Sequence, residues 1–180
     1  GSAEHEYLHS RRKELHGYLP QRTANFSGEF AVPKLGDFES LLTEQSREIS
    51  TTLAFVRALN ILLKNKSIGE QIVPIIADEA RTFGMEGLFR QIGIYNPHGQ
   101  NYVPQDREGV SYYKEATSGQ VLQEGINELG SIASWVAAAT SYSTHDLPMV
   151  PFYIFYSMFG FQRVGDMTWL AGDQQARGFL

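Results

Sequence analysis

Three groups of side chains in the sequence have the types needed for proton transfer and for stacking on a flat ligand. Asp78 and Glu79 directly follow one apolar run, and Glu128 precedes a stretch rich in alanine. Tyr156 and Phe159 follow a second apolar run. Carboxyl groups act as general acids or bases when their surroundings shift the pKa, and aromatic rings bind flat ligands by stacking. The groups are far apart in the sequence, so only the fold can join them.

Each candidate also has an ordinary structural interpretation. A glutamate in the first turn of a helix, as expected for Glu128, commonly complements the helix dipole. Phe159 is close to other phenylalanines and suits a core position, and Arg81 is placed to neutralise Asp78 and Glu79. Glu128 is the strongest candidate, because a carboxylate at the start of a largely apolar helix is costly unless it is paired or protonated.

The elements that position these groups alternate between strand and helix. Short apolar runs at 72–77 and 148–155 and a weaker one at 120–124 predict strands. Apolar periodicity and composition predict helices at 4–19, 38–63, 126–142 and 157–170, with Asp37 as the N-cap of the second. Pro74 indicates an edge position or a strand start. We therefore expect an α/β fold with a mainly parallel sheet flanked by helices and right-handed crossovers.

In such a sheet, ligands bind at the carboxyl ends of the strands. Asp78 and Glu79 follow the first expected strand, residues 124–128 follow the second, and Tyr156 and Phe159 follow the third. The sequence therefore predicts that two acidic clusters and one aromatic cluster share one edge of the sheet.

Composition narrows the class of protein. The chain has 180 residues, of which 42% are hydrophobic and 12% aromatic, as expected of a packed domain. A net charge of −5 without a dense basic face disfavours nucleic-acid binding. The absence of cysteine excludes disulfides and thiolate chemistry. No apolar run is long enough to span a bilayer and the first residues do not resemble a signal peptide, so we expect no membrane partner and a cytoplasmic location.

Both ends of the chain look like positions at which a longer polypeptide was cut. The sequence starts with Gly1-Ser2 and stops at an apolar Phe179-Leu180, whereas natural ends are commonly polar and exposed. We expect a segment of a longer protein, with a helix and interdomain linker at 1–36 and one domain at 37–180 that is incomplete at its C-terminal end.

Other chemistries have little support. His5 and His9, spaced to face each other on a helix, are suited to clamp a metal ion, but no third ligand is evident. The sequence contains neither a nucleophile elbow nor a phosphate-binding Walker loop. No metal site is predicted within this chain.

Several runs of residues resemble one family. The six residues Gly125-Ile126-Asn127-Glu128-Leu129-Gly130 resemble the pyrimidine-binding signature of transketolase-like thiamine diphosphate enzymes. Longer runs resemble the homodimeric bacterial pyruvate dehydrogenase E1 family, and they cover residues 48–52, 75–89, 138–144, 156–163 and 171–178. The fold that this resemblance implies is the pyrimidine-binding domain of these enzymes.

The resemblance also implies roles for individual residues. Glu128 is expected to hydrogen-bond a pyrimidine ring nitrogen and so activate the cofactor, which serves as an electron sink during decarboxylation. Phe159 is expected to stack on the pyrimidine, and Ile126 to hold the cofactor in its bent shape. Tyr156 is expected to face the thiazolium or the substrate.

The other residues that the resemblance implicates are polar. Asp78 and Glu79 resemble an acidic pair near the active centre. Asp106 and Arg163 are expected in a polar channel that links paired active sites.

The resemblance implies partners as well. The motif that holds the diphosphate through Mg²⁺ is missing, because Gly165-Asp166 and Gly172-Asp173 are not followed by glycine. We therefore expect the metal to be bound outside this segment and the cofactor to lie at the interface of a homodimer. The full protein is expected to decarboxylate pyruvate and to acetylate the lipoyl group of E2, the dihydrolipoyl acetyltransferase. The isolated segment is expected to be inactive.

Two alternatives stay open from the sequence. One is another transketolase-like enzyme that acts on a different 2-keto acid or on a sugar. The other is a domain without catalysis that serves assembly.

Overall fold

The computed structural model describes residues 1–15, 17, 23–43, 48–105 and 112–180 and shows an α/β fold. Its main sheet is parallel and has the order β4-β1-β5, built from β4 (Leu122–Gln123), β1 (Ile72–Ile76) and β5 (Val150–Ile154). The predicted fold class is thereby confirmed. A second, two-stranded parallel sheet joins β2 (Ile94–Tyr95) to β3 (Glu115–Ala116). The sequence does not predict it, because strands of two residues carry no periodicity.

Helices cover both faces of the main sheet. On one face, α3 (Thr51–Lys64) and α4 (Gly87–Gln91) share a buried cluster with Ile72 and Ile76. On the other face, α5 (Glu128–Ala139) and α7 (Gly160–Asp173) share a cluster with Ile75. Neighbouring side chains of β1 thus alternate between the two faces, as the pleat of a strand requires. Burial on both sides explains why the run 72–76 is apolar throughout.

Pro74 lies inside the central strand, so the edge or strand-start position predicted from it is wrong. The carbonyls of Ile72 and Ile76 accept hydrogen bonds on the β4 side, from the Gln120 side chain and the Glu124 N–H. By alternation, the backbone of Pro74 faces that side too. The paired register between β1 and β4 starts only at Ile75, so the missing N–H of Pro74 falls before this ladder begins.

The single helix predicted at 38–63 is also wrong. The structure has a 3₁₀ turn η1 (Leu35–Phe38), a short α2 (Glu39–Leu42) and the separate helix α3. Ser50 is the N-cap of α3, since its Oγ accepts from Leu53 N–H at 3.1 Å. Asp37 instead accepts from the backbone N–H of Lys34 at 2.9 Å. The apolar stripe lapses between α2 and α3, and the capping serine follows that lapse.

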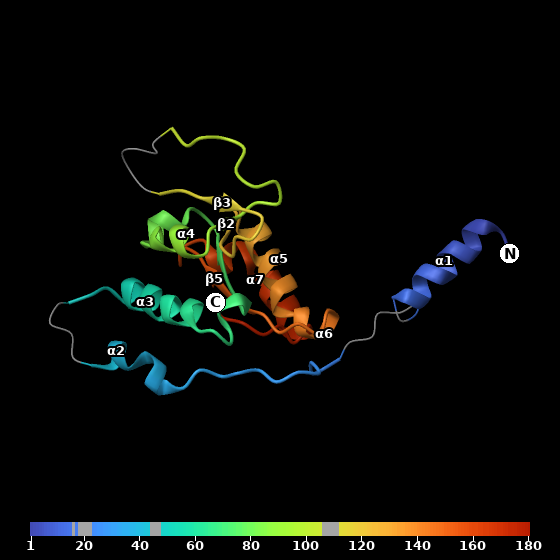
Figure 1. Cartoon of the computed structure of the whole chain (residues 1–180), viewed down its shortest axis with the longest axis horizontal. Helices are drawn as coiled ribbons and strands as arrows, with labels where there is room; N and C mark the ends of the chain where they lie inside the picture. Colours follow the sequence, from blue (N-terminus) through green and yellow to red (C-terminus); the bar gives the residue numbers. More distant parts are fainter. Residues whose placement is uncertain (16, 18–22, 44–47, 106–111) are drawn as a thin grey trace.

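The other predicted helices are present with shifted bounds. Helix α1 (Ala3–Glu14) ends earlier than expected, and Figure 1 shows it apart from the body of the molecule. The stretch 126–142 divides into α5 and α6 (Ser141–Thr144), and α7 begins and ends three residues later than predicted. Two 3₁₀ turns, η2 (Gly69–Gln71) and η3 (Ala80–Phe83), flank β1.

Two further sequence-based expectations concern the chain as a whole. The division into 1–36 and 37–180 stays a prediction. None of the helices in the described ranges combines the length and the apolar character needed to cross a membrane.

Candidate functional site

The carboxyl ends of the three strands meet at one edge of the main sheet. Ala77 N–H donates to the carbonyl of Ile154 at 3.1 Å, which joins the ends of β1 and β5. Glu124 N–H donates to the carbonyl of Ile76 at 3.1 Å, which joins the ends of β1 and β4. The segments that carry the three groups of candidate side chains therefore leave the sheet at the same edge.

Glu128 begins helix α5 and is held there by its backbone. Asn127 is the N-cap, and its Oδ1 accepts from Gly130 N–H at 3.0 Å. The hydroxyl of Tyr153, on β5, donates to the backbone carbonyl of Glu128 at 3.3 Å. Gly125 has a φ of 67°, a left-handed conformation that glycine adopts readily, and it turns the chain from β4 into the helix.

The carboxylate of Glu128 is almost fully buried and forms an ion pair with Arg163. Glu128 is 8% exposed, and Arg163 Nη1 lies 2.5 Å from Glu128 Oε1. The hydrogen bond from Arg163 lowers the pKa of Glu128, and it outweighs burial, which acts in the opposite direction. The sequence suggests burial as the influence that tunes this carboxyl group. In the structure the arginine has the larger effect, so Glu128 is held in its charged form.

One aromatic ring lies against the charged end of Arg163, and two further rings extend from it. Its Cζ lies 4.2 Å from the centroid of the Phe159 ring, a cation–π distance. Tyr156 meets Phe159 edge to face at 6.5 Å between centroids, and the Phe83 ring lies 5.0 Å from that of Tyr156. Since Phe83 belongs to η3, this chain of rings connects the segment after β1 to the start of α7.

Asp78 and Glu79 lie at the same edge without joining this cluster. Asp78 is half-buried and Glu79 is exposed. Within the described residues, neither forms an ion pair with Arg81, so the structure does not bear out the ordinary interpretation of this acidic pair. The segment is instead fixed by its backbone, because Ala80 N–H donates to Gln123 Oε1 at 3.1 Å.

The remaining predicted residues fall in different places. Ile126 is 81% exposed, immediately before the N-cap of α5. Arg163 contacts both Glu128 and Phe159. Asp106 lies outside the described residues. Of the two residues predicted for the polar channel, only Arg163 lies within the described residues, and its side chain contacts Glu128 directly.

Two features near Glu128 are absent from the predicted set. One is Tyr153, whose ring lies in the core while its hydroxyl reaches the Glu128 carbonyl. The other is the hydrogen bond from Ser134 Oγ to Glu124 Oε1, at 2.6 Å. A buried tyrosine hydroxyl needs a hydrogen-bond partner. A tyrosine within an apolar strand therefore indicates a polar contact, and this is how Tyr153 could be identified from the sequence.

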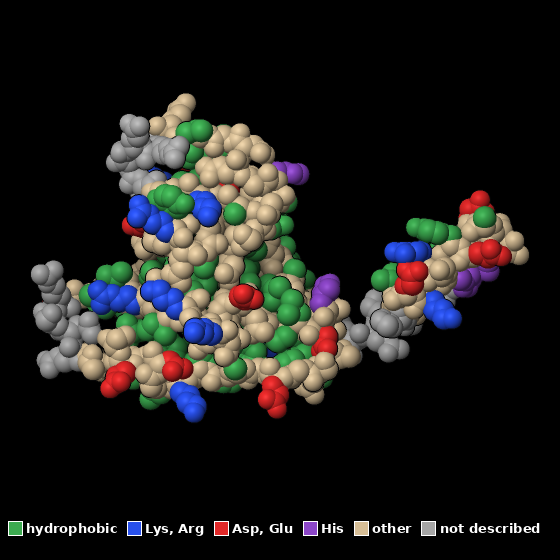
Figure 2. Space-filling model, in the orientation of Figure 1, with side chains coloured by type: hydrophobic (Ala, Val, Ile, Leu, Met, Phe, Trp, Pro, Cys, Tyr) green, Lys and Arg blue, Asp and Glu red, His purple; other side chains and the backbone are tan. Residues whose placement is uncertain are grey.

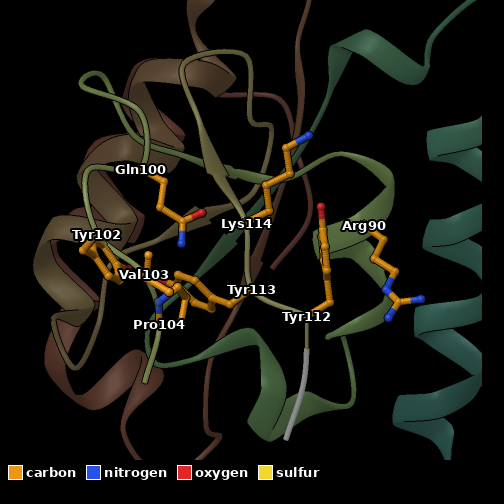
Figure 3. A pocket seen from close by; sticks show the side chains of 8 residues that line it. All are labelled: Arg90, Gln100, Tyr102, Val103, Pro104, Tyr112, Tyr113 and Lys114. Carbon is orange, nitrogen blue, oxygen red and sulfur yellow. The ribbon is translucent and has the colours of Figure 1, made fainter. Parts of the chain in front are cut away.

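A separate cavity of about 460 Å³ lies away from these residues. Figure 3 shows its lining, in which the guanidinium of Arg90 lies beside the ring of Tyr112, 5.1 Å from the ring centroid. None of the predicted site residues that the structure describes lines this cavity. In the part of the chain that the structure describes, no three metal-ligating side chains gather at one point.

Comparison with known proteins places the chain in a family. Residues 33–180 match the family model described as the pyruvate dehydrogenase E1 component middle domain. This match covers most of the chain. The chain belongs to the pyruvate dehydrogenase E1 component family.

Relatives within the E1 family are similar over the full length of the chain. The pyruvate dehydrogenase E1 component of Escherichia coli strain K12 is 72% identical over 180 residues, and that of Haemophilus influenzae is 69% identical. That of Cupriavidus necator is 58% identical over 182 residues. In each case the match covers 100% of this chain and 20% of the relative. The chain thus spans about a fifth of the length of the E1 components that it matches.

Proposed function

We propose that this segment supplies the pyrimidine-facing half of a thiamine diphosphate site in a pyruvate dehydrogenase E1 component. The full protein decarboxylates pyruvate and reductively acetylates the lipoyl group of E2. The observation that carries this proposal is the meeting of Glu128, Arg163 and Phe159 at the carboxyl edge of the sheet. Family membership supports it, because the relatives are named as pyruvate dehydrogenase E1 components.

The residues at this edge fit the pyrimidine half of such a cofactor. A heteroaromatic ring needs an acceptor or donor for its nitrogen, and the buried carboxylate of Glu128 offers one. It also needs a face to stack on, and Phe159 and Tyr156 are only partly covered by protein. The exposed side chain of Ile126 offers an apolar contact next to Glu128. When bound, the cofactor provides the electron sink on which decarboxylation depends.

When the cofactor is bound, Glu128 would share a proton with the ring nitrogen of that group. In the ion pair with Arg163 its pKa is lowered, so it is charged and could accept a proton only from a ring nitrogen that is itself protonated. If Arg163 swings away, burial remains and raises the pKa of the carboxyl group. The position of Arg163 therefore sets how strongly Glu128 holds the proton, which is the role we assign to this arginine.

The aromatic and apolar residues position the ring around this proton transfer. When the cofactor is bound, Phe159 would stack on the pyrimidine, Ile126 would support the bent form of the cofactor, and Tyr156 would face the reacting end.

The remaining polar residues act further from the pyrimidine. Asp78 and Glu79 contribute negative charge near the substrate. Asp106 belongs with Arg163 to a polar path between two active sites.

The rest of the site is assigned to parts of the protein outside this segment. Mg²⁺ and the diphosphate are held there, and the cofactor lies at the interface of a homodimer. The protein acts in the bacterial cytoplasm and delivers its product to E2. The isolated segment has no decarboxylase activity, so turnover by the purified 180-residue chain with Mg²⁺, cofactor, pyruvate and a dye acceptor would contradict the proposal.

The central test is the Glu128→Gln variant of the full-length enzyme. Glutamine keeps the shape and loses the acid–base function, so kcat is expected to fall roughly 100-fold or more. Glu70→Gln, at an exposed glutamate, is the matched control and is expected to retain activity. If Glu128→Gln left activity intact and altered the dimer in sedimentation, the segment would be an assembly domain instead.

Substrate choice is tested separately. Turnover of the full-length enzyme on pyruvate is expected to exceed turnover on 2-oxoglutarate and on sugar donors. A preference for either of the latter would assign the protein to another transketolase-like activity.

A further inference from the structure

The two histidines of helix α1 face each other across one helical turn. His5 Nε2 and His9 Nε2 lie 2.8 Å apart, and the ring centroids are 4.2 Å apart. Both side chains are exposed, and histidine side chains are visible on the surface of α1 in Figure 2. Neither residue takes part in the proposed cofactor site. The pair thus presents two imidazole rings to solvent from one helix.

The separation of these nitrogens is close to that of two ligands of one metal ion. Imidazole nitrogens lie about 2.0–2.1 Å from Zn²⁺, so two that meet at a right angle are about 2.9 Å apart. A tetragonal Cu²⁺ or Ni²⁺ site accepts two nitrogens side by side in this way. The distance between the nitrogens therefore needs little change to suit one ion, and the rings need only rotate to direct both nitrogens at it.

We propose that His5 and His9 form a clamp for a late first-row divalent cation, namely Cu²⁺, Ni²⁺ or Zn²⁺. Imidazole nitrogen suits these ions, and affinity rises to Cu²⁺ along the series of divalent metals. The carboxylates of Glu4 and Glu6, in the same turn, add negative charge that favours a cation.

Metal binding has a structural consequence for α1. The helix has 12 residues and none of them is buried against the described part of this chain, so packing within this chain does not stabilise it. A helix of this length is marginal in water when tertiary packing is absent. A ligand that binds only the helical form stabilises that form by mass action. The clamp therefore makes the helicity of α1 respond to the metal.

The competing explanation is a hydrogen bond between the two rings. One neutral imidazole can donate to the other at the observed 2.8 Å, and this alone would bring the nitrogens together. The two explanations differ in a measurable way, because only a clamp requires both histidines to hold one ion at the same time.

The test is titration of the 180-residue chain with Cu²⁺ and with Zn²⁺ by calorimetry. The chain is prepared with a short extension before Gly1, so that the terminal amine cannot join a chelate. The variant Glu6→His with His9→Glu keeps the composition and places the histidines on different faces of α1. Its affinity is expected to fall roughly 10-fold or more, because the second metal–nitrogen bond is no longer intramolecular. The control His98→Gln removes a loop histidine and leaves the pair intact.

Two further readouts separate the clamp from loose binding. Electron paramagnetic resonance of the Cu²⁺ form is expected to show two imidazole nitrogens in the parent chain and one in the swapped variant. Circular dichroism is expected to show a gain of helix on metal addition in the parent only. Equal affinity for parent and swapped variant, or an equal loss with His98→Gln, would overturn the proposal and leave the hydrogen bond as the explanation.

Discussion

Arg163 and Glu128 are 35 positions apart in the sequence, yet their side chains meet at 2.5 Å between Nη1 and Oε1. The contact joins the first turn of α7 to the first residue of α5. Both helices belong to the same face of the sheet, so the ion pair fixes one helix start against the other. Glu128 is nearly buried in this pair, whereas about half of the Arg163 side chain is exposed.

The first prediction concerns the pKa of Glu128, which is lowered from its ordinary value of 4.5 by Arg163. In Arg163→Met this pKa is expected to rise, because the hydrogen bond is lost while burial remains. The measurement is the pH dependence of the Glu128 carboxyl carbon signal in nuclear magnetic resonance. Arg90→Met, at an arginine that lies against Tyr112, is the control and is expected to leave the titration unchanged.

The same pair gives a pH dependence of stability. A carboxyl group whose pKa is lower in the folded state contributes stability above its ordinary pKa, and that contribution is lost as the pH falls through the lowered value. The urea midpoint of the parent is therefore expected to exceed that of Arg163→Met at neutral pH. Below pH 4.5 the difference is expected to shrink. A difference that stayed constant would mean that packing of the arginine stem, not the ion pair, is responsible.

The second prediction compares two glycines of α7. A Cβ added at Gly160 would overlap the Phe155 ring, whereas one added at Gly165 would meet nothing within 4 Å. Gly160→Ala is expected to destabilise the chain by roughly 1–3 kcal/mol because the ring must move. Gly165→Ala is expected to be neutral or to stabilise by up to about 1 kcal/mol, since alanine favours helix. Urea denaturation measures both, and equal effects would contradict the packing described for Phe155.

The third prediction concerns Tyr153 at alkaline pH. Burial, aided by the charge of Glu128, raises the pKa of Tyr153 to about 12 from an ordinary value of 10.0. A group with a raised pKa contributes stability below its ordinary pKa, and that stability is lost as the pH rises towards the folded value. The chain is therefore expected to lose stability between pH 10.0 and about 12.

Tyr153→Phe tests this directly. Near neutral pH the variant is expected to be about 1 kcal/mol less stable, because the hydrogen bond to the Glu128 carbonyl is lost. Above pH 10.0 it is expected to lose less than the parent does, since it has no phenol to ionise there. Ultraviolet absorbance of the phenolate groups is followed during an alkaline titration of both proteins. The variant is expected to lack the tyrosine that ionises near pH 12 in the parent. An unchanged titration curve would show that Tyr153 is not the group concerned.

The fourth prediction separates the two aromatic residues of the site in the full-length enzyme. Phe159→Leu is expected to weaken cofactor binding about 10-fold, because it removes the ring that we propose stacks on the pyrimidine and that contacts Arg163. Tyr156→Phe keeps the edge-to-face contact and is expected to leave cofactor affinity nearly unchanged while lowering kcat. Cofactor affinity is followed by fluorescence quenching and turnover by a dye-reduction assay. The reverse pattern would exchange the roles assigned to the two rings.

Part of this fold is predictable from the sequence because the relevant signals are local. The apolar runs at 72–77, 120–124 and 148–155 predict all three strands of the main sheet, and their order along the chain predicts the parallel arrangement. The break between α2 and α3 is less accessible. The break is marked by Ser50, which caps the start of α3. The apolar positions on either side of it also fit one longer helix, so the sequence alone does not reveal the break.

The contacts of the site are harder to predict. Glu128 can be chosen from its place at a helix start, but nothing local identifies Arg163 as its partner. The two meet because α5 and α7 pack side by side, which follows from tertiary structure alone. The central position of Pro74 is hidden for a similar reason, since it depends on how short the neighbouring strand β4 is. Local patterns thus identify the residues, while the packing of distant elements decides which of them touch.

The contact between Trp135 and Phe179 gives the molecule an internal optical reporter. Trp135 is 4% exposed and its Nε1 donates to the Phe179 carbonyl at 3.0 Å, whereas Trp169, the second tryptophan, is 81% exposed. One indole therefore emits from an apolar environment and the other from water. Phe179 is itself held at the edge of β5, where its carbonyl accepts from Tyr153 N–H at 2.9 Å. Acrylamide is therefore expected to reach the second indole at once but the first only after Phe179 leaves this edge. Detachment of this segment is thus expected to shift the Trp135 emission to longer wavelength while far-ultraviolet circular dichroism stays unchanged, whereas unfolding of the domain changes both signals.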